Sequence, residues 1–66
     1  MQIKNGSDLR SLRQHKNVSQ QILADRIGTT QAEISRIESN QTDPSLTTVI
    51  RYLRGLDLIV EVREDE

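Results

Sequence analysis

The fold is decided by residues 19–38, SQQILADRIGTTQAEISRIE. Apolar residues recur with helical spacing on both sides of Gly28, which suits the left-handed position that ends a helix. Ser19 and Thr30 can each cap a helix, because their hydroxyls can accept bonds from first-turn amides. Thr30 and Glu33 also fit a capping box, in which Glu33 bonds back to the Thr30 amide. The stretch therefore predicts two helices, 19–27 and 30–38, joined as a helix-turn-helix.

Helical spacing continues on both sides of this pair. A first helix is expected from a cap at Ser7 to about Lys16, with Leu9 and Leu12 on its buried face. After Pro44 a further helix begins, capped by Asp43 or Ser45. Gly55 is expected to end this helix. Its inward residues are expected at the spacing i, i+3, i+4, i+7: Leu46, Val49, Ile50 and Leu53.

The last segment changes to a period of two, which is typical of a strand over residues 57–63. A lone strand leaves its backbone amides and carbonyls unpaired. Pairing with the same strand of a second copy across a twofold axis satisfies them; the alternative is an extended tail that packs back on its own body. The candidate dimerisation residues are Leu58, Ile59, Val60 and Val62.

Length and composition limit the chain to one small domain, residues 1–66, with a body over 7–55. There is no cysteine and one histidine, His15, so neither a disulfide nor a metal site is expected. So small a core needs support, and association with another chain is what remains. No apolar run approaches the roughly 20 residues of a membrane span, and no secretory signal is visible, so a cytoplasmic protein without membrane contact is expected.

The net charge of −1 conceals a gradient along the chain. Residues 1–18 carry four cationic side chains against one acid, for +3, residues 19–40 sum to −1, and residues 41–66 carry six acids against three arginines, for −3. Such a distribution is compatible with one face meeting phosphate. No nucleophile and base stand in a catalytic context, so no enzyme is expected, and one aromatic residue, Tyr52, argues against modules that stack unpaired bases.

The helix over 30–38 has an outward face suited to a DNA groove. At 100° per residue, Ile34 and Ile37 define the inward direction. Gln and Arg can bond adenine and guanine edges, and Ala can touch a thymine methyl group. An ordinary solvated helix face is the alternative. The outward residues are Ala32, Ser35 and Arg36, with Gln31 at the edge.

The combination SQxxLAxxxG, TTQAxISRIE and PSLTT resembles the Cro/cI (XRE) helix-turn-helix family over roughly residues 7–55. The resemblance implies a mainly α, lambda-repressor-like DNA-binding domain of four to five helices, here with a C-terminal strand paired across a dimer. It also implies a structural ion pair between Arg13 and Glu38. The implied DNA contacts are Gln31, Ala32 and Arg36 on bases, and Gln20, Thr30, Ser35 and Asn40 on or near the backbone.

A four-helix body followed by a strand resembles the HipB-type antitoxins, which repress their own operon and bind a HipA-type kinase toxin. HigA-type antitoxins and solitary phage or plasmid repressors stay open as alternatives. The expected protein is a homodimeric repressor of a palindromic double-stranded operator, with no cofactor. A hypothesis of another class is an interaction module that holds a protein partner and not DNA.

Overall fold

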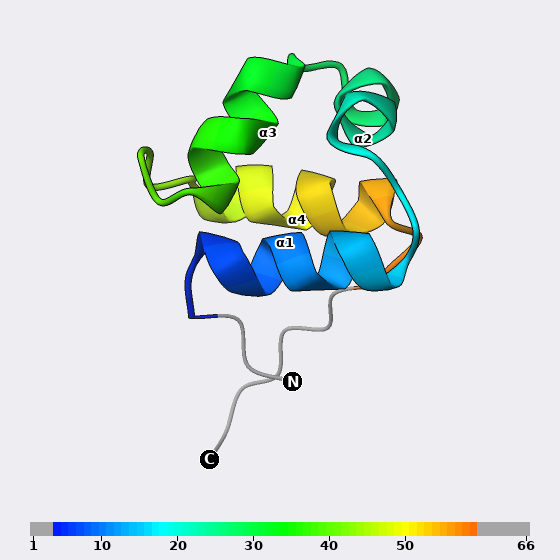
Figure 1. Ribbon diagram of the computed structural model, residues 1–66, viewed down its shortest axis with the longest axis horizontal. Helices are drawn as coiled ribbons and strands as arrows, with labels where there is room; N and C mark the ends of the chain where they lie inside the picture. The colour runs from blue at the N-terminus through cyan, green and yellow to red at the C-terminus, as the bar shows by residue number, and fades with distance from the viewer. Residues whose placement is uncertain (1–3, 60–66) are drawn as a thin grey trace.

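The computed structural model describes residues 4–59, which form four helices. These are α1 (Gly6–His15), α2 (Gln20–Ile27), α3 (Gln31–Glu38) and α4 (Leu46–Gly55). Helix α3 packs against α1 and α2, and α2 also packs against α4. Figure 1 shows α1 and α4 lying across the view, with α2 and α3 above them. The expected helical body is confirmed, with four helices among the described residues.

Three of the helices start at side-chain caps expected from the sequence. The hydroxyls of Ser19, Thr30 and Ser45 each accept a bond from the amide three residues further on. Ser45, and not Asp43, is therefore the cap of α4. Gly28 ends α2 with φ at 73°, in the left-handed region that glycine enters without a steric cost. The predicted helix-turn-helix boundaries are thus confirmed.

Two predicted caps are wrong. Asn5, and not Ser7, caps α1: its side-chain oxygen accepts from the amides of Ser7 at 3.0 Å and Asp8 at 3.3 Å. The Glu33 carboxylate turns forward to Arg36, 3.0 Å away, and not back to the Thr30 amide. A charged partner one turn ahead forms the stronger hydrogen bond for a carboxylate.

The core is apolar and draws on every helix: Leu9, Leu23, Ala24, Ile34, Ile37, Tyr52, Leu53 and Leu56. The predicted inward stripe of α4 is displaced by three residues, because Leu46 is 68% exposed and Tyr52 is fully buried. Val49, Tyr52, Leu53 and Leu56 keep the same i, i+3, i+4, i+7 spacing. The buried face of α4 is therefore centred on Tyr52, which the sequence pattern had left out.

The end of α4 also differs from expectation. Gly55 is its last helical residue, and the left-handed residue that follows is Asp57, with φ at 60°. A Cβ on Gly55 would lie 2.5 Å from Leu23 Cδ1, so glycine is needed there for close packing on α2. Leu58 packs partly buried against the core and Ile59 is 92% exposed, and neither is in a strand. Val60 and Val62 lie outside the described residues.

Gly6 provides a stability test, because α1 begins against the end of α3. A Cβ at Gly6 would lie 2.0 Å from the Ile37 carbonyl oxygen, which belongs to the backbone and cannot rotate away. Gly6→Ala should therefore lower the free energy of unfolding by about 1–3 kcal/mol, the usual range for overpacking. Urea denaturation measures this, with Gln14→Ala on the exposed side of α1 as the matched control. Equal stabilities for the two variants would contradict the close approach.

Candidate nucleic-acid interface

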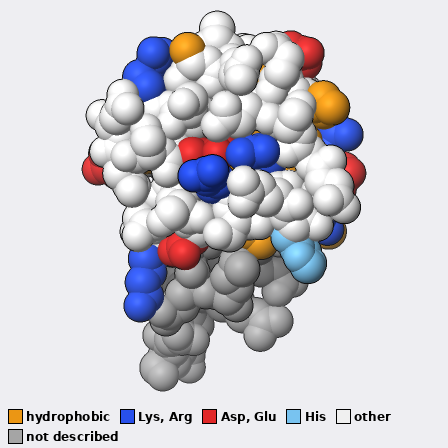
Figure 2. All heavy atoms as spheres, in the orientation of Figure 1, with side chains coloured by type: hydrophobic (Ala, Val, Ile, Leu, Met, Phe, Trp, Pro, Cys, Tyr) orange, Lys and Arg blue, Asp and Glu red, His pale blue; other side chains and the backbone are white. Residues whose placement is uncertain are grey.

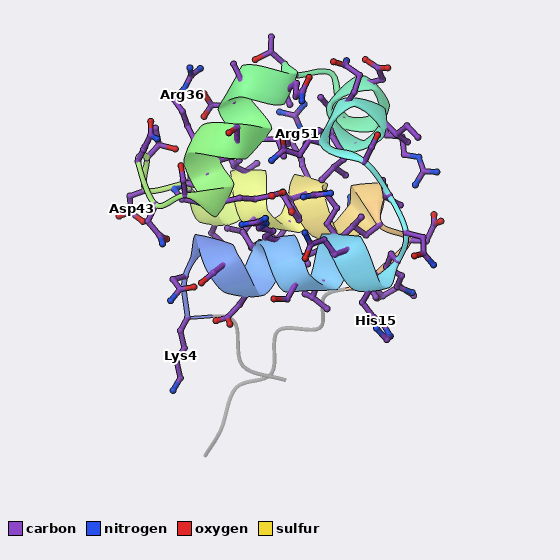
Figure 3. All side chains as sticks on the ribbon, viewed as in Figure 1. Lys4, His15, Arg36, Asp43 and Arg51 are labelled. Atoms are coloured by element: carbon purple, nitrogen blue, oxygen red, sulfur yellow. The ribbon has the colours of Figure 1, made fainter. Side chains whose placement is uncertain are left out.

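The outer face of α3 carries all three side chains expected to read bases. Gln31, Ala32 and Arg36 are exposed, together with Ser35, while Ile34 and Ile37 on the opposite side are buried. Figure 3 shows Arg36 pointing away from the body of the molecule. The four exposed residues therefore lie on one accessible helix face.

Beneath this face lies a buried ion pair between α1 and the last turn of α3. Arg13 Nε donates to Glu38 Oε2 at 2.7 Å, and Arg13 Nη2 donates to Glu38 Oε1 at 2.9 Å. The two side chains are only 9% and 2% exposed. Figure 2 shows acidic and basic atoms meeting in the middle of the visible face. A two-pronged contact of this kind fixes both distance and angle between the helices.

The Glu38 carboxylate has two further donors. Tyr52 Oη lies 2.6 Å from Oε2, and Gln20 Nε2 lies 3.2 Å from Oε1. The Tyr52 hydroxyl also lies 3.1 Å from the Leu9 carbonyl, but its single proton favours the nearer, charged acceptor. Arg13 Nη1 donates in addition to the Val18 carbonyl at 2.8 Å. Each Glu38 oxygen thus accepts two bonds, so the buried charge is well compensated.

Burial and the hydrogen bonds around Glu38 determine the protonation states of Glu38, Arg13 and Tyr52. Burial alone would raise the pKa of Glu38, but the bonds from Arg13, Tyr52 and Gln20 outweigh it and hold the pKa below its ordinary value. The hydrogen bond to Glu38 raises the pKa of Arg13. Burial, and then the neighbouring carboxylate, raises the pKa of the Tyr52 phenol well above its ordinary range. The pair is therefore fully charged near neutral pH.

Gln20 connects this buried group to the exposed face. A carboxylate can only accept, so Gln20 must turn its amide nitrogen toward Glu38. Its oxygen Oε1 then faces Gln31, whose Nε2 lies 3.4 Å away. This long, exposed contact favours one orientation of the Gln31 amide. Gln20, assigned to the DNA backbone from sequence, is in this structure bonded to Glu38 and Gln31.

The remaining candidate residues also have partners within the fold. The hydroxyl of Thr30 caps α3, and the carbonyl of Ser35 accepts from the Ser39 hydroxyl at 2.8 Å. Asn40 has φ at 62°, and its Oδ1 accepts from the Gly6 amide at 2.8 Å. That bond ties the start of α1 to the end of α3 and leaves the Asn40 amide nitrogen free to donate.

Sequence reasoning missed two residues of this region. In the sequence analysis Tyr52 was used only to argue against modules that stack unpaired bases. Its spacing from Val49, Leu53 and Leu56 places it on the buried face of α4. Arg10 was included there only in the charge of residues 1–18. In the structure Arg10 lines a hollow of about 320 Å³ between α1 and α3. The other lining residues are Arg13, Gln20, Ser35, Glu38 and Ser39.

Other kinds of site find no support between residues 4 and 59. In that range no histidines and carboxylates gather in a set that could hold a metal ion. None of the helices described there has the length and apolar character to span a bilayer.

Replacing Glu38 tests how much depends on the buried pair. Glu38→Gln leaves Arg13 buried without its counter-charge, which should lower the free energy of unfolding by about 3–5 kcal/mol. Because the folded pKa of Glu38 lies below the unfolded value near 4.5, its stabilisation is present above that value and is lost as the pH falls through the folded pKa. The variant should lack this part of the acid dependence.

Denaturation at neutral and acidic pH measures both effects. Glu33→Gln is the matched control, because Glu33 forms an exposed pair with Arg36 and its loss should change stability by less than about 1 kcal/mol. Similar losses for the two variants would show that Glu38 is not a central contact.

Comparison with known proteins agrees with this geometry. The family model described as "Helix-turn-helix" (HTH_3) matches residues 9–59. Antitoxin HigA1 of Mycobacterium tuberculosis is 41% identical over a 56-residue alignment that covers 79% of this chain and 38% of HigA1. The chain thus spans well under half the length of that relative.

Two proteins of known structure have the same fold. The restriction-modification controller protein C.AhdI from Aeromonas hydrophila superposes with a TM-score of 0.76 at 31% identity, covering 82% of both chains. HipB in the HipB-O4 20mer complex gives 0.77 at 28% identity, covering 100% of this chain and 99% of HipB, and in the HipA-HipB-O2-O3 complex it gives 0.75. With its helix-turn-helix, its exposed α3 face and these matches, the chain belongs to the HTH_3 family of helix-turn-helix DNA-binding domains.

Proposed function

We propose that the chain is a homodimeric transcriptional repressor that binds a palindromic double-stranded DNA operator and serves as the antitoxin of a toxin–antitoxin operon. The observation that carries the DNA-binding part is the bonded series from the buried Arg13–Glu38 pair through Gln20 to Gln31. It favours one orientation of an amide side chain on an exposed helix, which suits direct reading of a base edge.

Gln31 is oriented to recognise adenine. One of its two amide hydrogens points to Gln20 Oε1, which leaves the other hydrogen and the oxygen Oε1 available. Adenine presents the matching pair in the major groove, with N7 as acceptor and the N6 amino group as donor. Gln31 therefore reads adenine while keeping its bond to Gln20.

Arg36 and Ala32 complete the base-reading set. Arg36 bonds only to Glu33 through its exposed guanidinium, and such exposed pairs contribute about 0–1 kcal/mol. Arg36 can therefore leave Glu33 for guanine O6 and N7 at little cost. Ala32, without a polar group, suits contact with a thymine methyl group.

The DNA backbone is held on either side of these contacts. Gln20 begins α2, where the positive end of the helix favours a phosphate, and its second amide hydrogen is available. The Asn40 amide nitrogen and the hydroxyls of Thr30 and Ser35 supply further donors at the rim of α3. These contacts set the position of the domain on the duplex and carry no sequence information directly.

Dimerisation is assigned to the C-terminal strand. Recognition helices of a dimer must stand about 34 Å apart to enter successive major grooves, so the link between subunits must be rigid. Leu58 already packs against the body in the structure, which would anchor the start of such a strand. Leu58, Ile59, Val60 and Val62 are the residues proposed to join the two copies.

The antitoxin assignment draws on the likeness to HigA1 and to HipB. The HipA-HipB-O2-O3 complex favours a HipA-type kinase toxin as the protein partner. Co-purification with the product of the adjacent gene tests this; recovery of the chain alone would leave a solitary repressor.

The DNA assignment is tested by a mobility shift on the chain's own upstream region, measured over a salt series. Arg36→Ala should weaken operator binding by about 1–3 kcal/mol per half-site and relax the preference at one base pair, with binding to random DNA little changed. Gln20→Ala should weaken binding to all sequences, and it should also relax the preference at the base pair read by Gln31, because Gln20 orients Gln31. If wild type and Arg36→Ala prefer operator over random DNA equally, Arg36 does not read a base; if wild type shows no preference, the repressor assignment fails.

A chain ending at Ile59 tests the dimer. It keeps Leu56 and Leu58 on the core, so it should fold, and circular dichroism checks this. It should sediment as a monomer and lose cooperative binding to a palindromic site, because Val60 and Val62 each contribute roughly 1.5–3 kcal/mol on burial. A folded, dimeric 1–59 chain at micromolar concentration would place the interface elsewhere.

A further inference from the structure

Three arginines gather where α2 and α4 end. Arg26 of α2 and Arg51 and Arg54 of α4 line a hollow of about 340 Å³, with Ile27 and Gly55 as the other lining residues. All three arginines are exposed. The ion pairs found among residues 4–59 are Arg13–Glu38 and Arg36–Glu33, so none of the three is paired with a carboxylate in that part of the chain. We call these three residues the arginine cluster.

Two members of the cluster have a structural role. Arg26 Nη1 donates to the Gly55 carbonyl at 2.9 Å, and Arg51 Nη2 donates to the Ile27 carbonyl. Each helix thus receives an arginine from the other at its C-terminal end, where the helix dipole attracts a cation. Figure 3 shows Arg51 in the space between α4 and the helices above it. Each of these guanidiniums uses one donor of five, so most of their donors stay available.

The third member has no such role. Arg54 makes no side-chain bond within residues 4–59, and it brings a third positive charge to a place where two are already held. Like charges so close are unfavourable unless an anion lies between them. The cluster therefore has the chemistry of a carboxylate-binding site that the body of the chain does not fill.

The sequence contains a matching anion. Residues 64–66 are Glu, Asp and Glu, the densest run of negative charge in the chain. If strand 57–63 pairs antiparallel with its copy, residue 57 faces residue 63 of the partner, so residues 64–66 pass the turn at which the partner's α4 ends, beside its Arg54. An extended strand would also carry residue 64 roughly 20 Å beyond residue 58, away from its own Arg54.

We propose that the arginine cluster of each subunit binds the acidic residues 64–66 of a second copy, so that two reciprocal ion-pair contacts lock the dimer. This inference rests on the strand-paired dimer proposed above. In this contact residues 64–66 bind the arginine cluster. Arg54, which caps none of the four described helices, takes part in the contact as the third cation.

A charge-swap exchange distinguishes contact between subunits from contact within one chain. One variant carries Arg54→Glu, and the other carries Glu64→Lys, Asp65→Lys and Glu66→Lys. The homodimer of the second variant then sets three lysines against three arginines at both contacts. The cluster of the first variant keeps Arg26 and Arg51, so the mixed dimer has one full attractive contact and one weakened repulsive contact. Native mass spectrometry of the mixture should show an exchange constant about tenfold above random mixing at low salt, and nearly random mixing at 0.5 M salt, where the Debye length is about 4 Å.

Controls separate the possible failures. Lys16→Glu, an exposed charge reversal at the end of α1, replaces Arg54→Glu in a matched mixture and should exchange at random. Circular dichroism establishes that each variant folds. Random mixing by folded, dimeric variants would overturn the reciprocal contact and leave the strand dimer standing. A wild-type chain that sediments as a monomer would overturn the dimer itself, and with it the contact.

Discussion

The arrangement of the four helices depends on one carboxylate, that of Glu38. It ends α3, and it receives donors from α1 through Arg13, from α4 through Tyr52 and from α2 through Gln20. Burying an ion pair usually costs about as much as it returns, but removing one partner is expensive. Such a group therefore adds little net stability and strongly disfavours other packings, since no other placement of α3 would satisfy the charge.

This constraint extends to the surface. The Gln20 amide cannot reverse while Glu38 accepts its nitrogen, and Gln31 in turn is oriented by Gln20. A recognition side chain that is fixed before binding loses less conformational entropy on meeting DNA. Arg36 is the opposite case, because its exposed pair with Glu33 is easily exchanged. Of the two side chains proposed to read bases, Gln31 thus has a favoured orientation and Arg36 an exchangeable partner.

The sequence predicts structure reliably where only one nearby residue can satisfy a local requirement such as a helix cap. Ser19, Gly28 and Thr30 each stand where a cap is needed, and the two middle helices followed from them.

Prediction failed where two sets of residues satisfy the same requirement. Asn5 and Ser7 can both cap α1, and residues 46, 49, 50, 53 and 49, 52, 53, 56 have the same spacing. Contacts distant in sequence decide these cases: Asn40 accepts a hydrogen bond from the Gly6 amide, and Glu38 accepts one from the Tyr52 hydroxyl. The Arg13–Glu38 pair came from family resemblance, not from any periodicity.

The charge distribution follows from the same contacts. Arg13 is neutralised inside the body, so it adds no attraction for DNA, while Arg10 and Arg36 stay exposed on the side of α3. At physiological salt the Debye length is about 8 Å, so charges farther apart than this act almost independently. In the proposed dimer the acidic ends are matched by the arginine cluster, which removes both from the field that a phosphate meets. The net charge of −1 is then no obstacle to DNA binding, because the local cations beside α3 determine the interaction.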